Sequence, residues 1–126
     1  MTKTILVTGG AGYIGSQANS ALNNAGYRTI VLDNLSRGSK KSVIKGHFIE
    51  GDLFDKSLLH SIFSSEKIDA VMHFASFIDV GESVMDPAKY YENNVAGTLS
   101  LLNAMKEHDV NYFIFSSTAA IFGLPQ

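Results

Sequence analysis

The stretch Thr8-Gly9-Gly10-Ala11-Gly12-Tyr13-Ile14-Gly15 decides the fold of this 126-residue chain. An apolar run at residues 4–8, typical of a buried strand, precedes it, and helical spacing follows it. In such a strand–loop–helix unit, Gly9 allows a tight turn, Gly12 lets the backbone approach a pyrophosphate, and Gly15 lets the helix pack closely on the sheet. The free N–H groups and the positive end of the helix then hold the phosphates. The stretch therefore predicts a dinucleotide-binding loop.

Outward from this loop, short apolar runs alternate with longer stretches of helical spacing. Strands are predicted at residues 4–8, 28–33, 46–50, 69–74 and 112–116, and helices at 13–25, 55–65 and 87–108. Asp55 and Asp86 are the expected N-caps of the second and third helices, and Pro87 suits a first helical position. Residues 34–45 are predicted as a polar loop with at most a short helical turn.

Each predicted helix has an apolar stripe that we expect to face the core. The expected inward residues are Ile14, Ala18, Ala21, Leu22 and Ala25 in the first helix, Leu58, Leu59, Ile62 and Phe63 in the second, and Tyr91, Val95, Leu99, Leu102 and Met105 in the third. The third helix is long enough for a second, exposed apolar strip that includes Leu101 and Met105. That strip predicts self-association, as a homodimer through the helix at 87–108.

Short apolar strands separated by helices indicate right-handed crossovers and a parallel sheet that is covered on both faces. The predicted fold is therefore an α/β, doubly wound parallel sheet of the Rossmann type with about five strands. Ligands of such sheets bind beyond the carboxyl ends of the strands, where the strand order reverses. The polar residues discussed below all follow a predicted strand.

Composition excludes several classes of function. The chain has no cysteine, which excludes a disulfide scaffold, a thiol nucleophile and a cysteine-ligated zinc site. The four histidines are scattered, without the spacing of metal ligands, so no metal site is expected. A net charge of −2 makes nucleic acid and acidic membrane surfaces unexpected partners. No apolar run approaches the roughly 20 residues of a membrane span, and a cytoplasmic protein is expected.

Two acidic residues follow the second and third predicted strands. A carboxylate at Asp33 can accept both hydroxyls of an adenosine ribose and repels a 2′-phosphate, so NAD is favoured over NADP as the cofactor. Arg37 and Lys40 lie close enough in sequence to Asp33 to reduce its exclusion of NADP. Asp52 can accept from the adenine amino group, with Leu53 against the ring, although both aspartates also suit ordinary turns.

Several motifs together resemble the extended short-chain dehydrogenase/reductase family, over nearly the whole chain. The motifs are the glycine loop, Val31-Leu32-Asp33-Asn34-Leu35-Ser36, Gly51-Asp52-Leu53, His73-Phe74-Ala75, Val80-Gly81-Glu82-Ser83, Tyr91-Glu92-Asn93-Asn94-Val95-Ala96-Gly97-Thr98 and Phe115-Ser116-Ser117-Thr118-Ala119-Ala120. The glycine loop and Asp33 are shared across the superfamily. The segments at 80–84 and 93–98 are more specific to its group of nucleotide-sugar epimerases.

The resemblance implies a set of site residues. Those implied to bind NAD are Gly9, Gly12, Tyr13, Ile14, Gly15, Asp33, Asn34, Asp52, Leu53, Phe74, Ala75, Ser76, Asn94, Ser116 and Ser117. Thr118 matches the catalytic Ser/Thr that hydrogen-bonds the sugar 4-hydroxyl. Ile78 stands where some members carry a phosphate-contacting lysine, so that contact is not expected.

The activity implied by the resemblance is epimerisation of a UDP-hexose at C4. A tyrosine, its pKa lowered by a lysine four positions later, removes the 4-hydroxyl proton while hydride moves to NAD and back through a 4-keto sugar. None of the five tyrosines here is followed by lysine at that spacing. We therefore expect residues 1–126 to be an NAD-binding domain without the later strands and the substrate lobe, inactive alone but able to bind NAD.

Other interpretations remain open at this point. A nucleotide-sugar 4,6-dehydratase usually has Asp-Glu after the threonine, where Ala119-Ala120 stands here. A UDP-glucuronate epimerase or decarboxylase differs in residues beyond Gln126. A dinucleotide-binding module or sensor without enzymatic activity is the alternative from another class.

Overall fold

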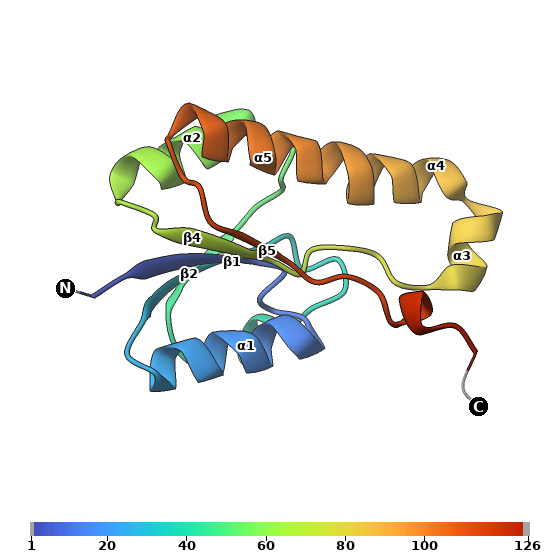
Figure 1. Cartoon of the computed structure of the whole chain (residues 1–126), viewed down its shortest axis with the longest axis horizontal. Coiled ribbons are helices and arrows are strands. Elements are labelled where there is room, and N and C mark those ends of the chain that lie inside the picture. Colours follow the sequence, from blue (N-terminus) through green and yellow to red (C-terminus); the bar gives the residue numbers. More distant parts are fainter. Residues whose placement is uncertain (1, 125–126) are drawn as a thin grey trace.

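The computed structural model, which describes residues 2–124, contains one parallel five-stranded sheet of order β3-β2-β1-β4-β5 (Figure 1). The strands are β1 (Thr4–Thr8), β2 (Arg28–Asp33), β3 (His47–Glu50), β4 (Ala70–His73) and β5 (Phe113–Phe115). All five predicted strands are confirmed, with ends shifted by at most one residue. The parallel sheet with reversed strand order on either side of β1 confirms the doubly wound α/β fold.

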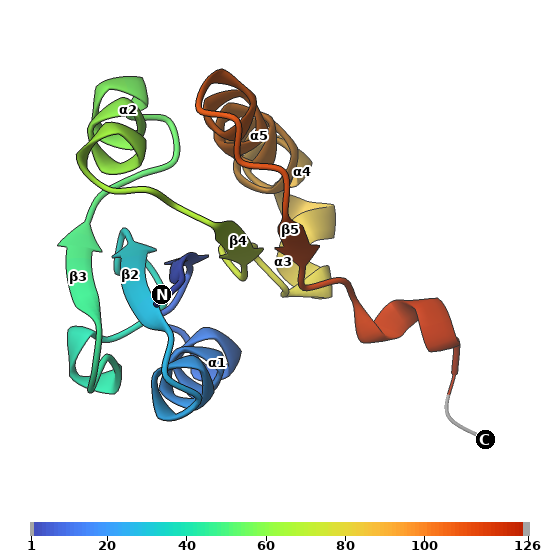
Figure 2. The ribbon, with the colours of Figure 1, turned by 60° about the vertical axis from the view of Figure 1, so that its left-hand side comes forward.

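Helices cover both faces of the sheet, as Figures 1 and 2 show. α1 (Tyr13–Asn24) lies on one face, and α2 (Lys56–Ser65) and α5 (Gly97–Glu107) lie on the other. Between the sheet and the α2–α5 layer is a core of buried apolar residues that includes Leu6, Leu32 and Leu101. A smaller cluster of Ile5, Val7 and Val31 lies within the α1 side of the sheet. Every residue of β1 is buried, because the strand has neighbours on both edges and helices on both faces.

The predicted helix ends are confirmed by their capping contacts. Asp55 accepts a hydrogen bond from the Leu58 backbone N–H (3.0 Å) at the start of α2. Asp86 accepts from the Lys89 N–H (3.2 Å) and precedes Pro87 at the first position of α4 (Pro87–Tyr90). A π-helical segment, η2 (Tyr91–Ala96), joins α4 to α5 without a break. The 3₁₀ turn η1 (Lys40–Ser42) is the short turn expected in the polar loop.

The predicted inward face of α1 is wrong in part: Leu22 packs against the smaller core cluster as expected, but other residues of the stripe do not. Ile14 is 60% exposed and Ala21 and Ala25 are exposed, whereas Gly15 and Asn19 are buried. The helix is turned by two contacts that its apolar pattern does not encode. Gly15 rests on the backbone of the glycine loop, and the Asn19 side chain donates to the Lys45 carbonyl (2.8 Å).

The predicted faces of the long helix are wrong at most positions. Four of the five residues expected in the core are exposed, namely Tyr91, Val95, Leu99 and Leu102. The fifth, Met105, is buried as expected, but so is Leu101, and the second strip that was predicted to be exposed therefore faces the core. The exposed stripe thus runs from η2 into α5, and the face of α5 that packs on the core is the one with Leu101 and Met105.

Two short helical elements were not predicted. α3 (Val80–Met85) begins where Asp79 accepts from the Glu82 N–H (2.9 Å), and the 3₁₀ turn η3 (Ala119–Phe122) follows β5. Within residues 2–124, no helix is long and apolar enough to cross a membrane.

Candidate functional site: a cleft at the carboxyl ends of the strands

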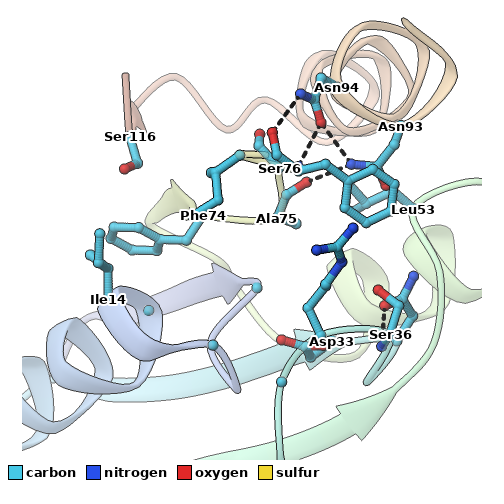
Figure 3. Close-up of a pocket in the computed structure, with 18 of the residues that line it drawn as sticks. Ile14, Asp33, Ser36, Leu53, Phe74, Ala75, Ser76, Asn93, Asn94 and Ser116 are labelled. Carbon is cyan, nitrogen blue, oxygen red and sulfur yellow. Dashed lines mark hydrogen bonds between the residues drawn. The ribbon is translucent and has the colours of Figure 1, made fainter. Parts of the chain in front are cut away.

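A cleft of about 900 Å³ opens at the carboxyl edge of the sheet, where the strand order reverses between β1 and β4 (Figure 3). The loops after β1 and β2 form one wall, and the loops after β4 and β5 form the other. Its volume is in the range of ligand-binding pockets. Its position is the one where doubly wound sheets bind their ligands.

The glycine loop, which belongs to the first of these walls, packs closely against neighbouring backbone. Gly9 has φ of +71°, and a Cβ there would lie 2.5 Å from the Phe74 carbonyl carbon. A Cβ on Gly15 would lie 2.2 Å from the Gly9 carbonyl oxygen. Gly12 is different, because a Cβ there would meet only Gly9 O at 3.4 Å. Gly12 is also the N-cap of α1 and offers no side chain to the free N–H groups of the first turn.

Asp33 ends β2 with its carboxylate fixed by two backbone donors. The side chain is 9% exposed, and Oδ2 accepts from the Ala11 N–H at 3.0 Å while Oδ1 accepts from the Leu35 N–H at 2.8 Å. Asp33 therefore fastens the glycine loop to the loop after β2. Each carboxylate oxygen keeps a further lone pair that can accept a ligand hydroxyl.

The neighbouring acid, Asp52, is exposed at the end of the same wall. It accepts from the Asn34 side-chain amide at 3.2 Å and from the Phe54 N–H at 3.1 Å. Asn34 in turn accepts from the Ser36 N–H. Leu53, next to Asp52, is buried and lines the cleft.

On the opposite wall, Asn94 holds the loop after β4 in place, as the dashed bonds in Figure 3 show. Its carbonyl oxygen accepts from the Phe77 N–H (2.8 Å), and its amide donates to the Phe77 carbonyl (3.0 Å). The Asn93 amide also donates to the Asn94 oxygen (2.8 Å). Asn94 thus couples the helical layer to the cleft-lining segment that contains Ala75 and Ser76.

A buried imidazole links the sheet to the same asparagine. The Thr98 hydroxyl donates its proton to the backbone carbonyl of Asn94 (2.6 Å). Its oxygen lies 3.0 Å from His73 Nε2 and can therefore only accept a hydrogen bond from that nitrogen. His73 is therefore the Nε2–H tautomer, and its Nδ1 accepts from the Thr8 hydroxyl (2.6 Å). Burial lowers the pKa of His73 from 6.5 to about 4, so the ring is neutral at pH 7.

A charged cluster spans the cleft on the Asp33 side. The Glu82 carboxylate of α3 accepts from the Arg37 guanidinium, from Lys89 Nζ (2.6 Å) and from the Tyr90 hydroxyl (2.7 Å). Hydrogen bonds from Lys89 and Tyr90, and then Arg37, lower the pKa of Glu82 to about 2. Burial and the bond to Glu82 raise the pKa of Tyr90, and Glu82 raises that of Arg37.

Every residue singled out from the sequence lies around this one cleft. The lining contains Gly9, Gly12, Tyr13, Ile14, Gly15, Asp33, Asn34, Asp52, Leu53, Phe74, Ala75, Ser76, Asn94, Ser116, Ser117 and Thr118. Ser116 and Thr118 enter it from the segment that follows β5.

Sequence reasoning missed part of the lining, notably Phe77, Asp79, Tyr90 and Asn93, and did not connect Arg37 to Glu82. The signal for Asn93 was present in its pairing with Asn94. No local pattern joins Arg37 to Glu82, which lie 45 positions apart. Among residues 2–124, no group of three His, Cys, Asp or Glu side chains is placed to hold a metal ion.

Comparisons with known proteins agree with this geometry. The model of the NAD dependent epimerase/dehydratase family matches residues 5–126. The chain is 51% identical over 124 residues to a UDP-glucose 4-epimerase of Rhizobium leguminosarum bv. trifolii, covering 98% of this chain and 38% of that protein. It is 53% identical over 121 residues to a UDP-glucose 4-epimerase of Halalkalibacterium halodurans, and this match covers 96% of this chain and 36% of that protein.

Solved structures give the same result. The crystal structure of UDP-glucose 4-epimerase from Brucella ovis in complex with NAD superimposes with a TM-score of 0.93 at 46% identity, over 99% of this chain and 38% of that one. The UDP-glucose 4-epimerase of Bifidobacterium longum in complex with NAD⁺ and UDP gives 0.90 at 40% identity, over 98% and 39%. The chain thus spans somewhat over a third of the length of the proteins it matches, and it belongs to the NAD dependent epimerase/dehydratase family.

Proposed function

We propose that residues 1–126 are the NAD-binding domain of an enzyme that epimerises a UDP-hexose at C4, interconverting UDP-glucose and UDP-galactose through a 4-keto sugar. The observation that carries the proposal is the cleft at the switch point, where the glycine loop, Asp33 and Thr118 meet around one space. Family membership supports NAD as the cofactor, and several of the similar structures are described as complexes with NAD.

The residues present fit a dinucleotide. The open position at Gly12 and the uncapped N-terminus of α1 suit the pyrophosphate, because they offer N–H donors and no side chain in the way. The fixed carboxylate of Asp33 suits the adenosine ribose, and Asp52 with Leu53 suits the adenine. The remaining predicted contacts suit the nicotinamide half, on the opposite wall: Phe74, Ala75, Ser76, Asn94, Ser116 and Ser117.

Bound NAD would supply a reversible hydride acceptor at this wall. The chain's own contribution to the chemistry is Thr118, whose hydroxyl we assign to a hydrogen bond with the sugar 4-hydroxyl. The tyrosine base and its lysine do not occur at the family spacing within these 126 residues. We therefore expect NAD binding by this chain without turnover.

Two alternatives in the same family differ in chemistry. Ala119-Ala120 after Thr118 argues against a 4,6-dehydratase, which usually has Asp-Glu there. The other candidates are UDP-glucuronate epimerases and decarboxylases, and a dinucleotide-binding module without activity.

Isothermal titration of the chain with NAD tests the cofactor assignment, and Asp33→Ala is the first variant to compare. We expect saturable binding that the variant weakens by about ten-fold, since two hydrogen bonds to the ribose are lost. A coupled UDP-galactose assay on the same preparation should show no turnover. Absence of NAD binding by a folded chain would overturn the proposal. Turnover would contradict the assignment of the base to a tyrosine outside these residues.

A further inference from the structure

We propose that Glu82 determines cofactor specificity in this chain, by holding and neutralising Arg37, the cation that would otherwise accept the 2′-phosphate of NADP. The inference rests on the proposed function, because it assumes that the adenosine ribose lies at Asp33. It concerns a residue of α3, on the wall opposite to the one that carries Asp33.

The segment after Asp33 carries the cations that NADP would need. Proteins that bind NADP in this type of fold place an arginine near the ribose, where it bonds the 2′-phosphate. Arg37 lies four positions beyond Asp33 and lines the cleft. Gly38 sets the position of its backbone, because a Cβ on Gly38 would lie 2.6 Å from Ala11 of the glycine loop, and the Ser39 N–H donates to the Ala11 carbonyl (3.0 Å). The backbone next to Arg37 is therefore fixed beside the glycine loop.

The Arg37 guanidinium is already occupied from across the cleft. It donates to Glu82 Oε2 and lies 5.1 Å from the centroid of the Phe77 ring. Lys89 Nζ is 5.0 Å from the centroid of the same ring and donates to Glu82 Oε1 (2.6 Å). A carboxylate and an aromatic ring thus contact both cations, and a phosphate would have to compete with them.

Glu82 is itself held firmly in this role. The Tyr90 hydroxyl, on the partly buried side of the cluster, donates to Glu82 Oε2 (2.7 Å), and Phe77 packs against the Tyr90 ring at 5.5 Å. The low pKa of Glu82 keeps the carboxylate ionised across the physiological range. Glu82 is therefore a negatively charged partner for Arg37 at any pH at which the protein would work.

The second basic side chain of this segment is also engaged elsewhere. Lys40 Nζ lies 5.5 Å from the centroid of the Phe48 ring, on β3. In the cluster near the ribose, Arg37 and Lys89 face three carboxylates, those of Glu82, Asp33 and Asp79. Loss of the Glu82 charge would remove the one carboxylate that is bonded to both cations and make the cluster less negative, which favours the additional phosphate of NADP.

The test compares the ratio of NADP to NAD dissociation constants, by isothermal titration, for the parent chain, Glu82→Gln, and the double variant Glu82→Gln with Arg37→Gln. We expect Glu82→Gln to shift this ratio towards NADP by about ten-fold, the value of one charge-assisted hydrogen bond. The double variant should return the ratio to that of the parent chain or below. Glu107→Gln, which removes an exposed charge near the end of α5, is the matched control and should leave the ratio unchanged.

The outcomes separate this inference from the proposed function. If the parent chain binds NAD and Glu82→Gln leaves the ratio unchanged, the inference is overturned and the cofactor assignment stands. If the double variant keeps the shifted ratio of Glu82→Gln, another group binds the phosphate and the role of Arg37 is wrong. If the folded parent chain binds neither dinucleotide, both proposals fail. Far-ultraviolet circular dichroism of each variant confirms that the comparison is made between folded chains.

Discussion

Nδ1 of His73 lies 2.6 Å from the hydroxyl of Thr8, across the boundary between β4 and β1 at the point where the strand order reverses. The two residues are 65 positions apart, and both are fully buried. Through Nε2 the same ring reaches Thr98 and, through it, Asn94 on the cleft wall. A neutral imidazole thus ties two strands and a helix together directly beneath the cleft.

This arrangement predicts acid sensitivity with a defined origin. The pKa of His73 is about 4 in the folded chain and about 6.5 when unfolded, so between these values only the unfolded chain binds the proton. Stability therefore falls as pH drops from 6.5 to 4, by about 3 kcal/mol in total from this group. Urea unfolding at several pH values should show this slope, and His73→Gln should reduce it. An equal slope in His73→Gln and the parent would show that other groups cause the acid sensitivity.

Substitution of two glycines of the loop should have different effects, a loss of stability for Gly15→Ala and a loss of NAD affinity for Gly12→Ala. Gly15→Ala places a methyl 2.2 Å from the Gly9 carbonyl oxygen, so the backbone must shift, at a cost of about 1–3 kcal/mol in unfolding free energy. Gly12→Ala meets only one atom at 3.4 Å, so it should fold almost normally while the methyl narrows the phosphate site. Thermal unfolding and NAD titration of both variants check this pair. Equal stability losses in both variants would contradict it.

The buried Asn19 predicts a purely structural effect. Its side chain is 1% exposed and donates to the Lys45 carbonyl at 2.8 Å, so Asn19→Ala leaves that carbonyl with one partner fewer. We expect a loss of about 1–3 kcal/mol in unfolding free energy without a change in the affinity for NAD. Asn103→Ala, at an exposed position of α5, is the control and should cost less than about 0.5 kcal/mol. A large loss of NAD affinity in Asn19→Ala would show that this residue also shapes the site.

The exposed apolar stripe of the long helix predicts self-association. Val95 and Leu99 are 50% and 55% exposed and lie with Tyr91 and Leu102 on one helix. We propose that this stripe is a homodimer surface, and analytical ultracentrifugation should show association that increases with concentration. Leu99→Lys should shift the equilibrium to monomer. Ile44→Lys, at an exposed apolar position in another part of the chain, is the control and should leave the monomer–dimer equilibrium unchanged. A parent chain that is monomeric at high concentration would refute the proposal.

Much of the fold follows from local sequence, since β-branched runs mark the strands and Asp55 and Asp86 mark two helix starts. Many cleft residues, such as Asp33 and Ser116, were also predictable, because they end or follow strands and parallel strands bring their carboxyl ends to one edge. Asn94 lies on the long helix, and its place in the cleft was implied only by the family resemblance. The orientation of α1 was not, because a close approach at Gly15 and a hydrogen bond at Asn19 outweigh the apolar stripe. The buried face of the long helix was not predictable either, because it carries two apolar stripes and the local pattern does not show that the one with Leu101, rather than the one with Val95 and Leu99, packs on the core.

The strand order also governs how this chain must fold. β1 is central, yet its partner β4 comes some 65 residues later, and no two adjacent strands are joined by a hairpin. Each pairing therefore requires closure of a loop, at a cost in chain entropy, before the contacts between the strands can form. The large sequence separation of β1 and β4 makes their pairing slow. Until that closure, the edge of β1 that pairs with β4 has unpaired backbone groups. The β1–β4 pairing is thus the step at which folding competes with aggregation, and chaperone dependence should be greatest for variants that weaken it.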